Sequence, residues 1–260
     1  MRPEQLFKAK RSEQIQKLGE NEAIAELTNN WMNAANNLKY SYHYEWQGRP
    51  IIQYPQDIVA MQELIWDVKP DLIIETGIAH GGSLIFSASM LALLDISDAI
   101  ESGSTINPKK TKRKVLGIDI DIRAHNREAI EAHPMSSRIH MIQGSSIASN
   151  VIDQVKDIAK NYERVLVCLD SNHTHDHVLA ELKAYAPLTS VSSYCVVFDT
   201  IIEDMPTETF PSRPWSRGNN PKTAVWEYLK SHPEFKVDKK IQHKLLVTVA
   251  PDGYLKRIKD

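Results

Sequence analysis

The sequence predicts an α/β protein with a Rossmann-like, doubly wound and mostly parallel sheet. The first observation is that short apolar runs alternate with helical patterns from residue 56 onward, which is typical of a parallel sheet covered on both faces. The second is that Gly-rich or acidic residues follow these runs, as they do at ligand-binding strand ends. The third is a short Pro-Asp-Gly turn before the last run. So short a turn cannot cross over the sheet, and we therefore expect the last strand to be antiparallel.

The N-terminal part has a different pattern from the rest. Residues 4–38 are helical in pattern but irregular in the spacing of their apolar residues, and residues 40–50 alternate aromatic side chains before a Gly-Arg-Pro turn. The alternation predicts a short strand or hairpin. We interpret residues 1–50 as a helical and aromatic segment suited to oligomerisation, and a ligand-facing aromatic surface is the alternative.

Residues 51–260 are expected to form one Rossmann-like domain. Its predicted helices are 56–68, 84–94, 124–132, 150–159, 175–185 and 222–230. Its predicted strands are 72–74, 115–120, 139–143, 164–169, 194–198, 245–249 and 254–258. Two insertions, 95–113 and 200–220, interrupt the pattern. The second carries Phe210 and Trp215, and bulky apolar residues in so long a connection are typical of a lid over a ligand.

Composition and charge exclude several classes of protein. The chain has 31 Lys and Arg against 33 Asp and Glu, so neither nucleic acid nor an anionic membrane is expected as a partner. No run approaches the roughly 18 apolar residues of a membrane span, and the first residues lack the apolar core of a signal peptide. Cys168 and Cys195 lie in apolar runs and are expected to be free thiols. A cytoplasmic enzyme is the expectation.

The strongest local motif is Ile73–Ser83, IIETGIAHGGS, between a predicted strand and helix. Gly77 lets the backbone turn, and Gly82 lets it approach a ligand closely. The spacing is not GxGxxG, and Glu75 at the strand end disfavours a pyrophosphate. A cationic cofactor that carries an amino acid, S-adenosylmethionine, is therefore favoured over NAD. A purely structural Gly-rich turn remains the alternative.

The next two strand ends carry candidate nucleoside contacts. Asp119 can accept both hydrogen bonds of a ribose diol, whereas Asp121 is interpreted as a helix cap. Gly144-Ser145-Ser146 can bracket an adenine ring, and a helix cap is the alternative for these serines. The nucleoside-binding interpretation is favoured because this is the third consecutive strand end that carries candidate cofactor contacts.

The fourth and fifth strand ends predict acid–base and metal chemistry. His173 can accept a proton from a hydroxyl at neutral pH. Asp170 and Asp199 place two carboxylates in one crevice, which suits Mg²⁺, and loop-capping aspartates are the alternative. A zinc site that uses His173 and His177 is the minor alternative, and His175 and His177 are expected to face solvent.

Taken together, these motifs resemble the cephalosporin hydroxylase family, whose members include S-adenosylmethionine-dependent methyltransferases such as rhamnosyl O-methyltransferases. The resemblance covers about residues 45–258. It is carried by GRPI with the following Gln53, Pro55 and Asp57, and by KPDLIIETGIAHGGSL, GIDID, LDSNHTH, GNNPKTAV and APDGYL.

The resemblance implies a class I methyltransferase-like fold with S-adenosylmethionine as cofactor. The cofactor contacts that it implies are Glu75, Gly77, Gly82, Ser83, Asp119 and Ser145. Asp170, at the end of the fourth strand, is a further expected contact because it can bind the cofactor's amine. It also implies Mg²⁺ near Asp170 and Asp199, with His173 as general base. One position departs from the pattern, because Phe198 stands where metal-binding members carry an acidic residue. The metal is then weakly held, moved onto Glu203 or Asp204, or absent.

The expected function is an S-adenosylmethionine-dependent O-methyltransferase that acts on a hydroxyl of a sugar-like or secondary-metabolite acceptor. Its partners are expected to be that small molecule and further copies of the chain. The alternatives are a cofactor-binding protein without catalysis, a nicotinamide oxidoreductase, and an iron-dependent hydroxylase. The hydroxylase would need Asp170, His173 and His177 as a facial triad.

Overall fold

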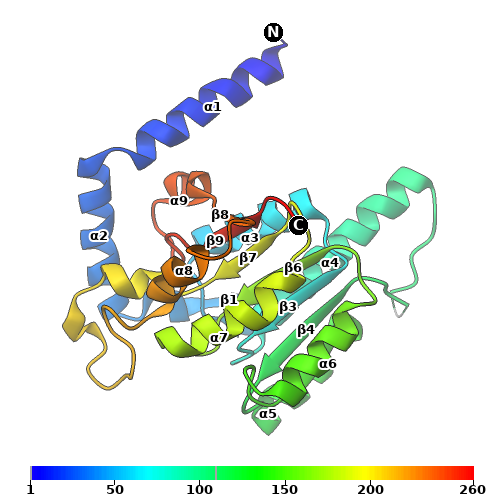
Figure 1. Ribbon diagram of the computed structural model, residues 1–260. Coiled ribbons are helices and arrows are strands. Elements are labelled where there is room, and N and C mark those ends of the chain that lie inside the picture. The colour runs from blue at the N-terminus through cyan, green and yellow to red at the C-terminus, as the bar shows by residue number, and fades with distance from the viewer. Residues whose placement is uncertain (1, 109) are drawn as a thin grey trace.

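The computed structural model describes residues 2–108 and 110–260. Its centre is a seven-stranded sheet with helices on both faces, in the strand order β5-β4-β3-β6-β7-β9-β8 (Figure 1). The strands are β3 Leu72–Thr76, β4 Lys114–Asp119, β5 Ile139–Gln143, β6 Val165–Leu169, β7 Tyr194–Val197, β8 Phe235–Val237 and β9 Tyr254–Arg257. β3 to β7 pair in parallel, while β9 is antiparallel to both β7 and β8. The predicted fold class is confirmed.

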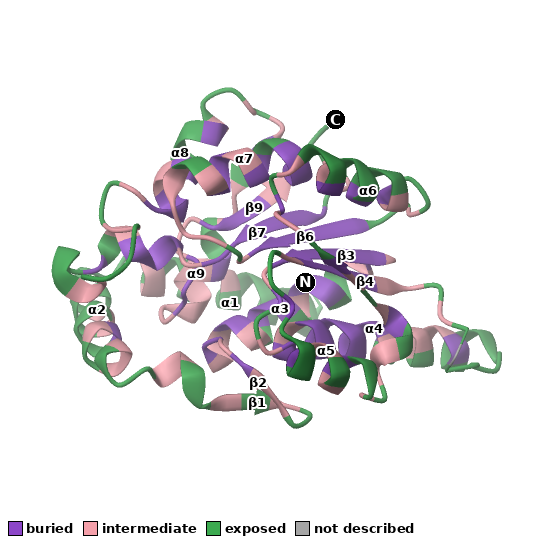
Figure 2. Ribbon diagram, turned by 90° about the horizontal axis from the view of Figure 1, so that it is seen from below, coloured by how far each residue is buried: buried purple, intermediate pink, exposed green. Residues whose placement is uncertain are grey.

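Two apolar layers cover the sheet (Figure 2). Ile73 and Leu166 belong to a layer with buried residues of α3, α4 and α9, whereas Leu72 and Ile74 belong to a layer with α6, α7 and α8. Neighbouring residues of one strand thus enter opposite layers, as the pleat requires. The helices are α3 Pro55–Val68, α4 Gly82–Ser102, α5 Ala124–Glu131, α6 Ser149–Ala159, α7 His175–Tyr185, α8 Pro221–Leu229 and α9 Lys239–Leu245.

The C-terminal part differs from the prediction. Residues 245–249 do not form a strand, because α9 runs to Leu245 and Leu246 has a positive φ of 60°, which no strand residue adopts. The backbone N–H of Val249 donates to a carboxylate oxygen of Asp57 at 2.9 Å in place of a strand partner. The neighbour of β9 at the sheet edge is β8, a strand of three residues that is too short to give a clear sequence pattern.

The N-terminal segment consists of α1 Pro3–Gly19, α2 Glu22–Asn37, the 3₁₀ turn η1 Tyr40–His43, and the strands β1 Tyr44–Trp46 and β2 Arg49–Ile51. The helical pattern of 4–38 is divided at Asn21, whose side chain caps α2 by accepting the Ile24 N–H at 3.1 Å. β1 and β2 form the expected hairpin. The Trp46 indole donates to Ser89 Oγ of α4 at 2.9 Å, which fixes the hairpin against α4.

The insertion 95–113 begins as a continuation of α4, which extends beyond its predicted end (Figure 1). Arg113 pairs there with Asp98 at 2.7 Å. Contrary to the expectation from the sequence, α4 is long and apolar enough to cross a membrane by length and composition alone. Half of that stretch is buried within the domain, as in a core helix.

Candidate active site

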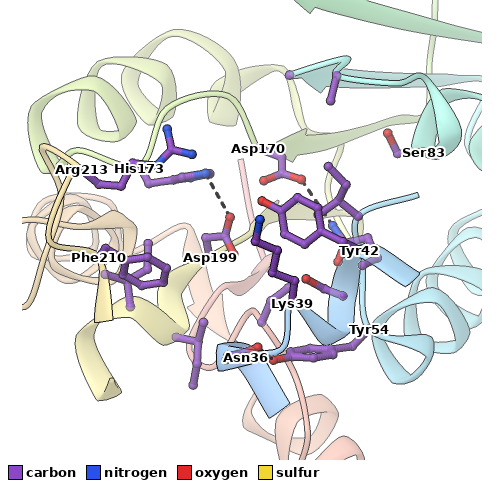
Figure 3. A pocket seen from close by; sticks show the side chains of 18 of the residues that line it. Asn36, Lys39, Tyr42, Tyr54, Ser83, Asp170, His173, Asp199, Phe210 and Arg213 are labelled. Atoms are coloured by element: carbon purple, nitrogen blue, oxygen red, sulfur yellow. Dashed lines mark hydrogen bonds and ion pairs between the residues drawn. The ribbon is translucent and has the colours of Figure 1, made fainter. Parts of the chain in front are cut away.

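A cavity of about 570 Å³ opens at the carboxyl ends of the parallel strands (Figure 3). Loops that follow β3, β6 and β7 line it, together with residues of the N-terminal segment, residues 52–54 after β2, the connection 200–220 and Val249. The structure brings most of the predicted site residues together here. Those that line this cavity are Gly77, Gly82, Ser83, Asp170, His173 and Asp199.

Three of these side chains form a compact polar cluster. Asp170 follows β6, His173 lies in the next turn, and Asp199 follows β7. Their ligand-type atoms all lie within 4.8 Å of one another. His173 Nε2 is 3.1 Å from Asp199 Oδ2, and the Asp199 backbone has a φ of 55°. Because β6 and β7 are adjacent parallel strands, their carboxyl ends place the two carboxylates side by side.

The electrostatics of this cluster suit a cation. Burial raises the pKa of Asp170 well above its usual range, and the neighbouring Asp199 carboxylate raises it further. A divalent ion between the two carboxylates would offset this repulsion, and carboxylate oxygens are ligands that Mg²⁺ prefers. Asp170 and Asp199 therefore fit the predicted metal. His173 remains available for a proton because Mg²⁺ does not require a nitrogen ligand.

The Phe198 departure leaves this cluster intact. Phe198 is buried in the apolar core, and Asp170, His173 and Asp199 approach one another without a side chain from that position. Glu203 instead accepts the Gly218 N–H at 2.7 Å, and Asp204 pairs with Lys222 at 2.6 Å. Because Glu203 and Asp204 are already bound to the lid and to α8, the structure does not support the alternative in which these two residues hold the metal.

Glu75 lies behind the main cavity. It borders a smaller cavity of about 30 Å³, whose lining also includes Ser83 and Asp170. Burial raises the pKa of Glu75 to about 7, and a hydrogen bond from the Ser83 hydroxyl opposes that rise. Within the part of the chain that the structure describes, no cation pairs with Glu75. Its carboxyl therefore ionises close to neutral pH, and it lies beside the loop predicted to hold the cofactor.

The two glycines of this loop are required by close backbone approaches. A Cβ at Gly77, where φ is 89°, would overlap the carbonyl oxygen of Asp170. A Cβ at Gly82 would overlap the carbonyl oxygen of Pro50 in the hairpin. The loop after β3 is thus pressed between the hairpin and the loop after β6, as expected of a ligand-binding turn.

Asp119 and Ser145 do not line either cavity. Asp119 Oδ2 accepts the Ile78 N–H at 2.8 Å, and Oδ1 accepts the Asp121 N–H at 3.0 Å. Asp119 therefore orders the loop that forms the cavity wall while its carboxylate stays half-exposed at the strand end. Asp121 does not cap α5, since that helix begins at Ala124 with Arg123 at its N-cap. Ser145 lies in the turn between β5 and α6.

The two remaining histidines of the predicted cluster serve other contacts. His177 Nε2 lies 3.1 Å from Ser146 Oγ and 3.4 Å from buried Glu181. His175 contacts Thr223 through Nδ1 at 2.8 Å. The expectation that both face solvent is wrong. Because His177 is engaged by residues outside the polar cluster, the structure does not assemble a zinc or iron site from His173 and His177.

Several lining residues were not predicted from the sequence. Gln53, which is 7% exposed, donates from Nε2 to Asp170 Oδ2 at 3.3 Å. Trp215 of the lid packs edge-on against the His173 ring, with 4.8 Å between centroids. Lys39, Tyr42 and Arg213 also line the cavity (Figure 3). The sequence contains an indirect signal for three of them: Gln53 follows the GRPI motif, Tyr42 lies in the aromatic stretch 40–50, and Trp215 lies in the connection 200–220. It contains none for Lys39 and Arg213.

Comparison with known sequences points to one family. The family model described as Rhamnosyl O-methyltransferase/CmcI matches residues 38–258. A rhamnosyl O-methyltransferase of Mycobacterium bovis (strain BCG / Pasteur 1173P2) is 28% identical over 206 residues, covering 77% of this chain and 73% of that protein. The Mycobacterium leprae (strain TN) rhamnosyl O-methyltransferase is 26% identical over 214 residues, covering 82% of each.

Solved structures show the same fold. A CmcI structure described with Mg and SAM has a TM-score of 0.54 at 18% identity, and the match covers 84% of this chain and 78% of that one. The apo structure of CalS11, a TDP-rhamnose 3'-O-methyltransferase, has a TM-score of 0.52 at 15% identity, and the match covers 100% of this chain and 97% of that one. The fold is thus shared over almost the full length.

Proposed function

Since the chain belongs to the Rhamnosyl O-methyltransferase/CmcI family, we propose that it is an S-adenosylmethionine-dependent O-methyltransferase acting on a hydroxyl of a sugar-like or secondary-metabolite acceptor. One observation carries the proposal. The Asp170, His173 and Asp199 cluster lies in the same cavity as the Gly-rich loop that follows β3. A proton acceptor and a cation site therefore face the place where a methyl donor would bind.

The donor site is formed by residues of the first strand ends. Gly77, Gly82 and Ser83 offer close backbone and hydroxyl contacts, and Asp170 lies across the loop from them. Glu75 provides the buried carboxylate that suits a cationic ligand. Asp119 and Ser145 are assigned to the ribose and adenine, beyond the cavity lining. When bound, S-adenosylmethionine supplies an electrophilic methyl group on a sulfonium.

His173 is the proposed general base. With Nε2–H donating to Asp199, the other ring nitrogen, Nδ1, is free to accept the proton of the acceptor hydroxyl. The Asp199 carboxylate then stabilises the imidazolium that forms, as a carboxylate does in a catalytic triad. Trp215, packed against the ring, holds its orientation and excludes water.

Asp170 and Asp199 are the residues that would hold Mg²⁺. The ion would supply Lewis acidity toward the acceptor oxygens and lower the pKa of the reacting hydroxyl. Gln53 fixes one Asp170 oxygen by its hydrogen bond, and this leaves the other oxygen free for a cation.

Methyl transfer is tested by incubating the purified protein with S-adenosylmethionine, Mg²⁺ and rhamnosides and measuring methylated product by mass spectrometry. Rhamnosides are chosen because the relatives named above are rhamnosyl O-methyltransferases. Calorimetric titration with S-adenosylmethionine and NAD separates the methyltransferase from the oxidoreductase. Donor binding without transfer to any acceptor would support the non-catalytic alternative. Oxygen-dependent turnover with bound iron would support a hydroxylase.

We also propose that the protein is a cytoplasmic homo-oligomer. The support for self-association is a group of exposed apolar side chains on the N-terminal segment, namely Leu6, Phe7, Leu27, Trp31 and Leu38. Such side chains are enriched where protein surfaces associate. Light scattering of the purified protein measures the oligomeric state directly.

A further inference from the structure

Two cationic side chains reach the cavity from separate elements. Lys39 lies at the junction of α2 and η1, and its side chain points into the cavity that Asp170 and Asp199 also line (Figure 3). Arg213 belongs to the lid and lies beside His173 (Figure 3). Within residues 2–108 and 110–260, neither side chain has a carboxylate within the 4.0 Å of an ion pair.

The other cations near the lid are neutralised by carboxylates. Lys222 pairs with Asp204 at 2.6 Å, and Arg217 lies 3.9 Å from Glu203. Arg213 differs, because its guanidinium lies over the Trp215 ring with 5.1 Å to the centroid. An aromatic face orients a guanidinium and leaves its N–H groups free to bind an anion.

The carboxylates of the cavity are committed elsewhere. Asp199 contacts His173, and both Asp199 and Asp170 fit a divalent cation. The proposed methyl donor adds a further positive charge at its sulfonium. With these groups in place, Lys39 and Arg213 leave an excess of positive charge on the acceptor side of the cavity. A neutral sugar would not balance that charge, whereas an anionic acceptor would.

Phosphate is the anion that this arrangement fits best. Arg binds phosphate through paired N–H donors, and Lys binds it as a point charge. Mg²⁺ sites commonly combine one or two carboxylates with phosphate oxygens of a substrate. Tyr42 and Phe210, which line the same cavity, add aromatic surface for a sugar ring or a base.

We propose that the acceptor is a sugar that carries a phosphate or diphosphate ester, and that Lys39 and Arg213 are the residues that recognise this group. The inference rests on the proposed methyltransferase function. The phosphate ester has two sources, a nucleoside diphosphate sugar and a lipid-linked sugar diphosphate, and the test distinguishes them.

The test compares acceptors that share one sugar. TDP-rhamnose, rhamnose 1-phosphate, a polyprenyl diphosphate rhamnose and methyl rhamnoside are assayed with S-adenosylmethionine and Mg²⁺. We expect kcat/KM for the best phosphorylated acceptor to exceed that for methyl rhamnoside by at least about tenfold, as expected for hydrogen bonds to a charged group. A preference for TDP-rhamnose would identify a nucleotide sugar as the acceptor, and a preference for the polyprenyl diphosphate rhamnose would identify a lipid-linked sugar.

Variants connect the preference to the two cations. Lys39→Met and Arg213→Met should each raise KM for the phosphorylated acceptor about tenfold or more, with a much smaller effect on kcat/KM for methyl rhamnoside. Lys39→Arg should retain most of the preference. Lys69→Met is the matched control. Lys69 has the same left-handed backbone at a helix end as Lys39, but its amine lies over the Trp66 ring and does not line the cavity. Arg217→Met is the control on the lid.

Two outcomes would overturn the inference. One is a kcat/KM of the wild-type protein for methyl rhamnoside that equals or exceeds the value for every phosphorylated acceptor. The other is a loss of kcat/KM in both variants that is equally large for charged and neutral acceptors. If none of the acceptors is methylated, the proposed methyltransferase function fails, and the inference about phosphate recognition is decided by a binding experiment instead. Titration of TDP-rhamnose and methyl rhamnoside into the protein with S-adenosylhomocysteine then decides the inference, which requires tighter binding of the phosphorylated sugar.

Discussion

His173 and Asp199, contributed by the loops after two adjacent parallel strands, meet with 3.1 Å between Nε2 and Oδ2. The contact fixes which ring nitrogen faces the carboxylate and which faces the cavity. Since Trp215 packs on the same ring, the imidazole is held on two sides. This geometry suits His173 to the role of proton acceptor that we propose for it.

Replacing His173 with Ala should therefore lower kcat by about 10²- to 10⁴-fold, the usual contribution of a general base. Donor affinity, measured by calorimetry, should stay within about twofold because the donor site is built from other strand ends. His140→Ala, which removes an exposed imidazole on β5, is the control. Undiminished turnover of the His173 variant would remove this residue from the mechanism.

Gln53→Leu should weaken metal binding. The Gln53 amide is the buried hydrogen-bond donor to Asp170, and loss of such a partner typically costs about 10- to 100-fold in metal affinity. Titration of the protein with Mg²⁺ or Mn²⁺, without substrate, measures the change. Gln62→Leu on the exposed side of α3 is the matched control. Equal metal affinity in both variants would show that Gln53 does not position Asp170.

Donor affinity should depend on pH through Glu75. Because burial raises the pKa of Glu75 to about 7, its carboxyl is mostly neutral at pH 6 and mostly ionised at pH 8. A cationic donor favours the ionised form, so affinity for S-adenosylmethionine should rise between these pH values. In Glu75→Gln this rise should be lost. A wild-type affinity that stays constant or falls over the same range would contradict the assignment of Glu75 to the donor.

Stability should depend on pH through Asp57. Its buried carboxylate accepts hydrogen bonds from Tyr254 at 2.6 Å and Val249 at 2.9 Å, yet burial raises the pKa to about 6, above the ordinary value of 3.8. The unfolded chain therefore releases this proton first as pH rises. The contribution of Asp57 to stability is fully present below about pH 4 and is lost toward pH 6, by about 3 kcal/mol at 1.4 kcal/mol per pKa unit.

Urea unfolding at several pH values between 4 and 7 measures this effect. Asp57→Asn should flatten the decline between pH 4 and 6, although it also disturbs the hydrogen bonds that the carboxylate accepts. Asp153→Asn, at an exposed position of α6, should follow the wild-type curve. If the decline persists unchanged in Asp57→Asn, another group is responsible for it.

The β-strands that were predicted correctly are those whose signal is local. β3, β4, β6 and β7 are apolar runs that are mostly buried on both faces, so their residue types indicate a strand directly. β5, at the sheet edge, instead alternates between more buried residues and the exposed His140 and Gln143. The apolar stretch 245–249 gave the same signal but forms a connection, because α9 extends to Leu245 and the Val249 N–H donates to Asp57 instead of to a neighbouring strand.

By itself, the sequence determined the parallel sheet, the Gly-rich turn and the positions of Asp170, His173 and Asp199 at strand ends. It could do so because parallel strands end at one edge, so that residues just beyond them must meet. Only the tertiary structure decided that Gln53, Lys39 and Arg213 join this site, and that His177 leaves it. These contacts connect segments distant in the chain through packing of the hairpin and lid, and packing between distant segments leaves no periodic pattern in sequence.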